Sequence, residues 1–144
     1  MLGDVRFGAA IPVRSVADSR GFYEGVLGVT PVRVQEREII YLAGGTLFGI
    51  YETEAAGKAG HTLGTFSGVD DIEAVVAGLR GMGVVFEEYD MPGIRTVAGI
   101  ADFGTERVAW FRDPDGNLLS IDDARLGADL GTGVRPTGLA GARV

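Results

Sequence analysis

Hydrophobic positions in the first half of the chain change period once, and the change predicts a strand followed by a helix. In Val5–Arg14 every second residue is apolar, which is the pattern of a strand with one buried face. After Ser15, whose spacing to Asp18 resembles a capping box, apolar residues recur at helical intervals until Gly28 supplies a stop. Three extended runs follow, at Thr30–Gln35, Glu38–Ala43 and Thr46–Glu52. This half therefore predicts the order βαβββ.

The second half repeats that order of elements. His61–Ser67 predicts a strand, and a second capping-box pattern at Asp70 and Glu73 predicts a helix that Gly83 ends. The segments after this helix predict a strand at Val84–Tyr89, an irregular loop to about Asp102, and a hairpin of Arg107–Arg112 and Leu118–Asp122 around the turn Asp113–Asn117.

The two halves predict one domain made of two related modules. Module one covers about residues 5–52, a small polar linker covers 53–60, and module two covers about 61–123, all within a single domain of residues 1–124. Residues 125–144 are Gly-rich without a clear period, and we expect a C-terminal extension outside the core. The predicted fold class is α+β, with two βαβββ modules.

Composition removes several classes of function. The chain carries a formal charge of −7, which argues against nucleic acid because phosphates require a basic surface. Its apolar runs are far shorter than the roughly 20 residues that cross a bilayer, and no secretory signal is visible. We therefore expect no membrane partner and a cytoplasmic location. With no cysteine and one histidine, His61, the chain has neither thiolate sites nor a pair of histidine ligands.

Short motifs in both halves resemble a known superfamily. They are Ala10–Val13 and Phe22–Gly28 in the first half, and Val69–Ile72 and Phe111–Asn117 in the second. In this order they resemble the vicinal oxygen chelate superfamily, the group of glyoxalase I, bleomycin-resistance proteins and extradiol dioxygenases. The resemblance implies curved mixed sheets around a cup, with the helices outside. Because such sheets leave edges to cover, a homodimer is also expected.

The resemblance also locates the positions where metal-dependent members hold their ligands. These members take a His from the first strand and a Glu from the last strand of a module. The matching positions here are Gly8, Gly49, Gly64 and Ser120, and a shift of one residue adds only Thr65 as a weak donor. A divalent cation needs three or four N or O donors, so we expect neither a metal nor another cofactor.

Residues on the same strand faces as these positions are the candidates for ligand binding. The strand period of two and the resemblance together predict a cup that is mostly apolar and aromatic. The chain's single tryptophan is the first candidate, and the acids Glu52, Asp102 and Glu106 at the rim would also allow a cationic ligand. The predicted ligand-binding residues are Trp110, Phe66, Tyr51, Tyr41, Ser120, Gly49 and Gly8.

Three functions remain open from the sequence. The first is a metal-free protein of the bleomycin-resistance type that binds an apolar or aromatic small molecule. The alternative is a glyoxalase-like isomerase, lyase or dioxygenase whose rearranged metal site would use His61 with Glu52 or Asp102. The third is a dimeric interaction module. For Phe22, Tyr23 and the Asp113–Asn117 run, packing and turn formation are the expected roles.

Overall fold

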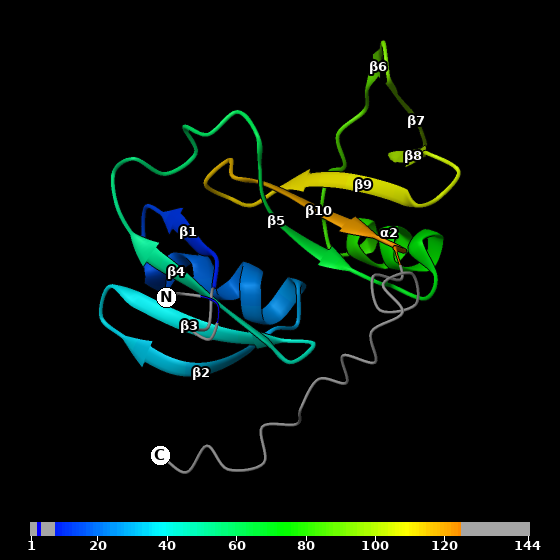
Figure 1. Ribbon diagram of the computed structural model, residues 1–144. Coiled ribbons are helices and arrows are strands. Elements are labelled where there is room, and N and C mark those ends of the chain that lie inside the picture. Colours follow the sequence, from blue (N-terminus) through cyan, green and yellow to red (C-terminus); the bar gives the residue numbers. More distant parts are fainter. Residues whose placement is uncertain (1–2, 4–7, 125–144) are drawn as a thin grey trace.

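The computed structural model describes residue 3 and residues 8–124 of the chain. It confirms the predicted α+β fold class, with mixed, curved sheets that do not close into a barrel (Figure 1). The first residues of the predicted strand Val5–Arg14 and the predicted extension 125–144 lie outside the described residues. No helix in the described part of the chain is long and apolar enough to span a membrane.

The first half forms a four-stranded sheet with the strand order β1-β4-β3-β2. β1 is parallel to β4, and the other neighbours are antiparallel. The Ser15 hydroxyl caps the first helix by accepting from the amide of Asp18 at 3.2 Å, and Gly28 ends it with a φ of 69°. The elements are β1 Ala10–Val13, α1 Val16–Arg20, the π-helical turn η1 Gly21–Val26, β2 Thr30–Gln35, β3 Glu38–Ala43 and β4 Thr46–Glu52.

The second half forms a six-stranded sheet with the order β5-β10-β9-β8-β7-β6. Here too the first strand, β5, is parallel to the last, β10. The elements are β5 Thr62–Ser67, α2 Ile72–Gly81, β6 Asp90–Met91, β7 Ile94–Val97, β8 Ile100–Asp102, β9 Arg107–Arg112 and β10 Leu118–Asp122.

Two details of the second half differ from the sequence prediction. The predicted strand Val84–Tyr89 is reduced to one bridge between Phe86 and Phe111, and the predicted irregular loop contains β6, β7 and β8. Glycines at positions 93 and 99, with φ of 87° and 80°, let this segment turn back twice. The helix cap is also one residue later than predicted, since Asp71 Oδ1 accepts from the amide of Ala74 at 2.9 Å.

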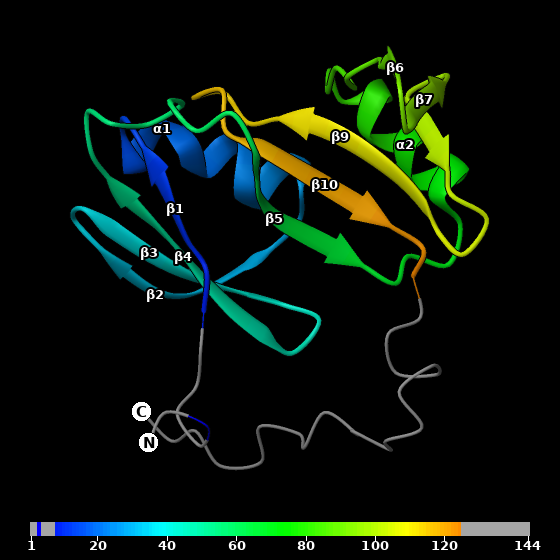
Figure 2. The same cartoon turned by 45° about the horizontal axis from the view of Figure 1, so that its top comes forward.

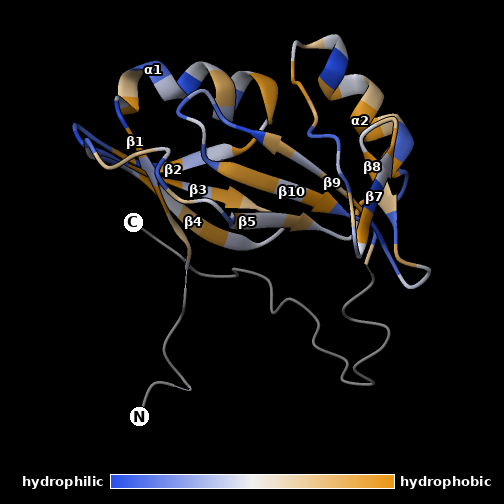
Figure 3. Ribbon diagram, turned by 90° about the horizontal axis from the view of Figure 1, so that it is seen from above, coloured by the Kyte–Doolittle hydropathy of each residue, from blue (hydrophilic) through white to orange (hydrophobic). Residues whose placement is uncertain are grey.

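Both helices cover the same side of the sheets (Figure 3). One continuous hydrophobic core lies between this helix layer and the strands, and aromatic rings from both halves meet in it. Tyr23 stacks on Tyr41 with centroids 5.8 Å apart, and Phe22 contacts Phe111 across the halves at 6.3 Å. The opposite side of each sheet, which we call the open face, carries no helix in the described structure.

The Asp113–Asn117 run forms the predicted hairpin turn and also joins the two halves (Figure 2). The buried Asp113 carboxylate accepts from the Tyr23 hydroxyl at 2.8 Å. The Asn117 side-chain amide donates to the carbonyl of Pro12 at 2.6 Å, and Arg14 pairs with Asp115 at 3.2 Å. The turn of module two is therefore fastened to β1 and η1 of module one, which fixes the distance between the sheets.

Candidate functional site

A groove lies where the two sheets approach each other, between β1 and β4 on one side and β5 on the other. It has a volume of about 480 Å³, within the range of ordinary small-molecule sites. Among residue 3 and residues 8–124, the polar side chains that line it are hydroxyls, and no charged side chain does so. The lining residues are Gly8, Ala9, Ile11, Ala43, Gly44, Thr46, Leu47, Phe48, Gly64, Thr65, Phe66, Ser67 and Leu119.

The hydroxyl groups along β5 already form some hydrogen bonds within the protein. Thr65 Oγ1 and the buried Ser120 Oγ lie 2.8 Å apart, so one of them donates to the other. Ser67 Oγ donates to Asp122 Oδ2 at 3.0 Å, and its lone pairs stay available. The groove can therefore offer one donor from the Thr65 and Ser120 pair and acceptors from both strands, which suits an uncharged ligand.

Four of the predicted ligand-binding residues lie in or near this groove. Gly8 and Phe66 line it, and Ser120 stands directly behind Thr65. Gly49 lies on the open face of β4, paired with Ala10 on one side and Ile40 on the other. The structure thus brings Gly8, Phe66 and Ser120 together, while Gly49 is two strand positions from the groove wall at Leu47.

The prediction placed Tyr41 in the cup, but in the structure its side chain does not face the cup. Its side chain is fully buried on the helix-covered face, where it stacks on Tyr23, and the neighbouring positions of β3 on the other face are only half-buried. Its hydroxyl donates to Glu24 Oε1 at 3.2 Å. Burial, reinforced by the Glu24 charge, raises the pKa of Tyr41 to about 12. Tyr41 is a core residue beneath η1.

Trp110 and Tyr51 lie on the open faces, away from the groove lining. Tyr51 is 40% exposed on β4. Trp110 pairs with Ser120 across β9 and β10, on the face opposite the buried Phe111. Its ring contacts Tyr89 and Phe103, at centroid distances of 5.6 and 6.4 Å.

Thr65, one residue after the predicted position Gly64, is the residue that lies opposite Ser120. The ladder between β5 and β10 shifts register between Leu118 and Leu119, so Gly64 lies opposite Leu119 and Thr65 opposite Ser120. A bulge of one residue moves every later side chain to the other face of a strand. The alternation of the sequence carries no mark of such a bulge, although a hydroxyl beside the predicted position was visible.

The residues at the family's metal positions do not fit a divalent cation. Gly8, Gly49, Gly64 and Ser120, together with Thr65 opposite Ser120, offer only two hydroxyls, which are already bonded to each other. Gly8 also lacks room for a ligating side chain, since a Cβ there would lie 3.0 Å from the carbonyl oxygen of Leu47. A glycine at such a position therefore does not always leave free volume for a ligand.

The residues required by the enzymatic alternative do not come together either. His61 is exposed at the start of β5, whereas the Glu52 carboxylate accepts from the amide of Val16 and faces Arg37 at 3.6 Å. Within residue 3 and residues 8–124, no group of three or more His, Cys, Asp or Glu side chains could hold a metal ion.

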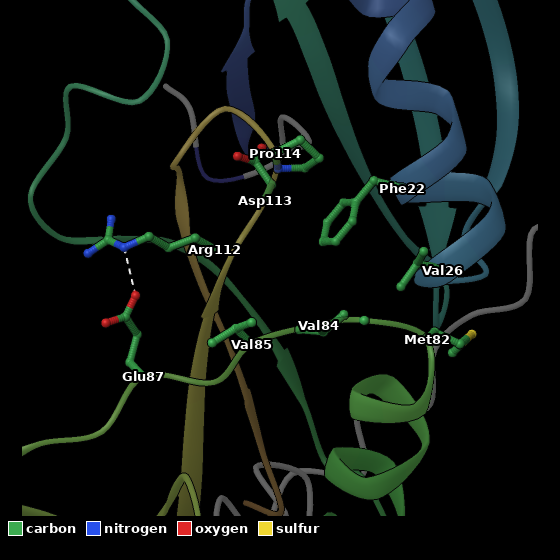
Figure 4. Close-up of a pocket in the computed structure, with 10 residues that line it drawn as sticks. Phe22, Val26, Met82, Val84, Val85, Glu87, Arg112, Asp113 and Pro114 are labelled. Carbon is green, nitrogen blue, oxygen red and sulfur yellow. Dashed lines mark hydrogen bonds and ion pairs between the residues drawn. The ribbon is translucent and has the colours of Figure 1, made fainter.

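A second hollow of about 410 Å³ lies on the helix side of the molecule, between η1 and the segment that follows α2 (Figure 4). Phe22 and Val26 face Val84 across it. Its polar groups are engaged, because Arg112 pairs with Glu87 at 2.7 Å and Asp113 is held by its own turn. No predicted ligand-binding residue lines this hollow, so the groove is the better candidate site.

A family model for the Glyoxalase/Bleomycin resistance protein/Dioxygenase superfamily matches residues 7–121. The chain belongs to this superfamily. The match covers both modules, and the resemblance that the sequence motifs carried is confirmed. No curated protein sequence matches the chain.

Solved structures share the fold at low sequence identity. A glyoxalase family protein from Enterococcus faecalis is 21% identical, with a TM-score of 0.63 over 85% of this chain and 99% of that one. The fosfomycin resistance protein FosX from Listeria monocytogenes, crystallised with Mn(II) and 1S,2S-dihydroxypropylphosphonic acid, is 14% identical, with a TM-score of 0.65 over 89% and 96%. An integron cassette protein of V. cholerae is 23% identical, with a TM-score of 0.55 over 85% and 98%.

Proposed function

We propose that this chain is a small-molecule-binding protein of the glyoxalase/bleomycin-resistance type that holds an uncharged, apolar or aromatic ligand in the groove without a metal. The observation that carries the proposal is the groove lining, which in the described part of the chain is apolar apart from hydroxyls and contains no charged side chain. Burying an apolar ligand there gains roughly 25 cal/mol per Å² of apolar surface, whereas an unpaired charge would lose its hydration without compensation. A phosphonate or other anion, as in the FosX complex, is therefore disfavoured.

Nile red, a neutral aromatic dye whose emission rises in apolar surroundings, tests the groove directly. We expect saturable binding by the native chain and a loss of at least roughly tenfold in Gly64→Leu, because a side chain at this lining position takes ligand volume. A Cβ at Gly64 would lie 3.8 Å from Leu119 Cδ2, which is an ordinary van der Waals contact. Gly60→Leu, with no neighbour within 4 Å of its Cβ, is the matched control. Equal binding by both variants would contradict the proposal.

The metal-free state is tested by elemental analysis of protein purified without chelator. We expect no stoichiometric transition metal, because the four family positions carry no carboxylate or imidazole. One equivalent of zinc, manganese or iron would overturn this part of the proposal and favour an isomerase, lyase or dioxygenase.

A homodimer is also proposed, on the evidence of the sheet edge. β2 ends the four-stranded sheet, and its side chains Val32 and Val34 are 52% and 53% exposed. An apolar edge strand of this kind pairs readily with another strand. Sedimentation should show a dimer at tens of micromolar that Val34→Lys weakens, and a monomeric native chain would contradict it. A cytoplasmic location remains a prediction from the composition.

A further inference from the structure

Three aromatic rings gather on the open face of the six-stranded sheet, outside the groove. Trp110 comes from β9, Tyr89 from the segment before β6, and Phe103 from the turn after β8. The Trp110 ring stands at 78° to Tyr89 and at 88° to Phe103. Each edge-to-face contact covers one face of one ring, so the other π faces of the group are not covered by these contacts. We call these three residues the aromatic corner.

The aromatic corner is accessible although its rings are large. Phe103 is 44% exposed, and Trp110 and Tyr89 are half-buried. Backbone bonds nevertheless hold the three segments in place. The amide of Glu87 donates to the carbonyl of Trp110 at 2.8 Å, and the amide of Phe103 donates to the carbonyl of Glu106 at 2.9 Å. Because the backbone of the cluster is fixed and its rings are open to solvent, little conformational freedom would be lost when a ligand binds.

Within the described part of the chain, no cation covers these rings. On the helix side, Arg80 lies over the Phe86 ring at 5.5 Å from its centroid, so that ring already has a cationic partner. Among the described residues, no Lys or Arg takes the same position over Trp110, Tyr89 or Phe103. The π faces of the corner thus lack the cation that an aromatic ring attracts.

Acidic residues adjoin the aromatic corner along the chain, although Arg107 lies opposite Asp102 in the β8–β9 ladder and Arg112 pairs with Glu87. Asp102 and Glu106 flank Phe103 in the turn, and neither forms an ion pair within the described part of the chain. The Glu87 carboxylate adds to burial in raising the pKa of Tyr89, which shows that a third acid acts on the cluster, although Arg112 offsets part of its charge. The chain as a whole carries a formal charge of −7. An organic cation is therefore favoured over an anion or a neutral molecule.

We infer that Trp110, Tyr89 and Phe103 form a binding site for an organic ammonium group. A trimethylammonium head suits it best, because its methyl groups contact the rings, its charge is spread over them, and it donates no hydrogen bond that the rings would leave unmet. The site is independent of the groove, so either can be present without the other.

Choline and 3,3-dimethylbutan-1-ol make the decisive comparison, because they share a shape and differ in the charge of the head. Both are titrated into the full chain at constant ionic strength, and the fluorescence of Trp110, the single tryptophan, is followed. Choline should change the emission saturably, while the neutral compound should bind at least about tenfold more weakly. Equal effects of the two compounds, or no saturation with choline up to about 0.1 M, overturn the inference.

Substitutions then test whether the rings are responsible. Phe103→Leu and Tyr89→Leu should each weaken choline binding roughly 2- to 30-fold, whereas Tyr89→Phe, which keeps the ring, should stay within about twofold of the native chain. Thermal melting checks that the variants fold, and the choline comparison on the native chain stands without them. Unchanged affinity in both leucine variants overturns the inference. Nile red binding should be unaffected by Phe103→Leu, so that a failure here is distinguished from a failure of the groove.

Discussion

Replacing Tyr23 with phenylalanine should measure how strongly the two modules are fastened together. Tyr23 is fully buried in η1, and its hydroxyl donates to the carboxylate of Asp113, which is itself 4% exposed, at 2.8 Å. Tyr23→Phe removes that donor while keeping the ring and its stacking on Tyr41. The change therefore isolates one buried hydrogen bond between module one and module two.

The size of the effect follows from the partners that Asp113 retains. Its Oδ1 atom accepts from the amides of Asp115 and Asn117, and its Oδ2 atom keeps the side-chain amide of Asn117. Hydrogen bonds to charged groups contribute about 1.5–3 kcal/mol, and the remaining partners moderate the loss, so we expect about 2 kcal/mol. For a chain of this length, that corresponds to a fall in Tm of roughly 4–8 °C.

Urea unfolding followed by circular dichroism provides the assay, with Tyr41→Phe as the matched control. The Tyr41 hydroxyl bonds to Glu24 at 3.2 Å, and Glu24 keeps its ion pair with Arg20 on the surface. This variant should therefore lose less than about 1 kcal/mol. If Tyr23→Phe costs no more than Tyr41→Phe, the Tyr23 bond does not fasten the modules as argued.

Three further predictions concern the turn, alkaline pH and metals. Gly57 and Gly44 both have positive φ, but a Cβ at Gly57 would lie 2.0 Å from the Asp115 carbonyl oxygen, whereas a Cβ at Gly44 would face open space. Urea unfolding should therefore show a loss in the free energy of unfolding of about 1 kcal/mol for Gly44→Ala and of about 3 kcal/mol or more for Gly57→Ala. Burial raises the pKa of Tyr23 and raises that of Tyr41 to about 12, so stability that is present below pH 10 should decline towards pH 12, less steeply in the double phenylalanine variant. Calorimetry with zinc and nickel should show no tight binding, and one-to-one binding would contradict the metal-free proposal.

Much of the fold could be predicted because its signals are local. Alternating apolar residues mark β3 and β4, helical spacing marks α2, and the glycines at 28 and 83 stop helices where positive φ is needed, with φ of 69° and 92°. The turn around Asp113 was visible for the same reason, since proline and glycine act on their own backbone. The hydrogen bond between this turn and Tyr23 could not be predicted, because it joins residues 90 positions apart and leaves no local pattern in the sequence.

The candidate site was harder to predict because it depends on which face each side chain takes. One bulge between β5 and β10 exchanges Gly64 for Thr65 opposite Ser120. Tyr41 was assigned to the wrong face although its strand bounds were right, because alternation gives two faces without saying which one the helices cover. The β6 to β8 segment was predicted to be a loop because its strands are only two to four residues long.

The β6 to β8 segment also holds Trp110 in a cluster that is separate from the groove. Its flanking turns bring Tyr89 and Phe103 against Trp110 on β9, while the groove lies at β5, on the other side of β10. Since neighbouring strands lie about 4.8 Å apart, Thr65 and Trp110, each paired with Ser120, are separated by roughly 10 Å across one face. The groove and the aromatic corner are therefore separate places, and a ligand bound at one of them does not have to contact the other.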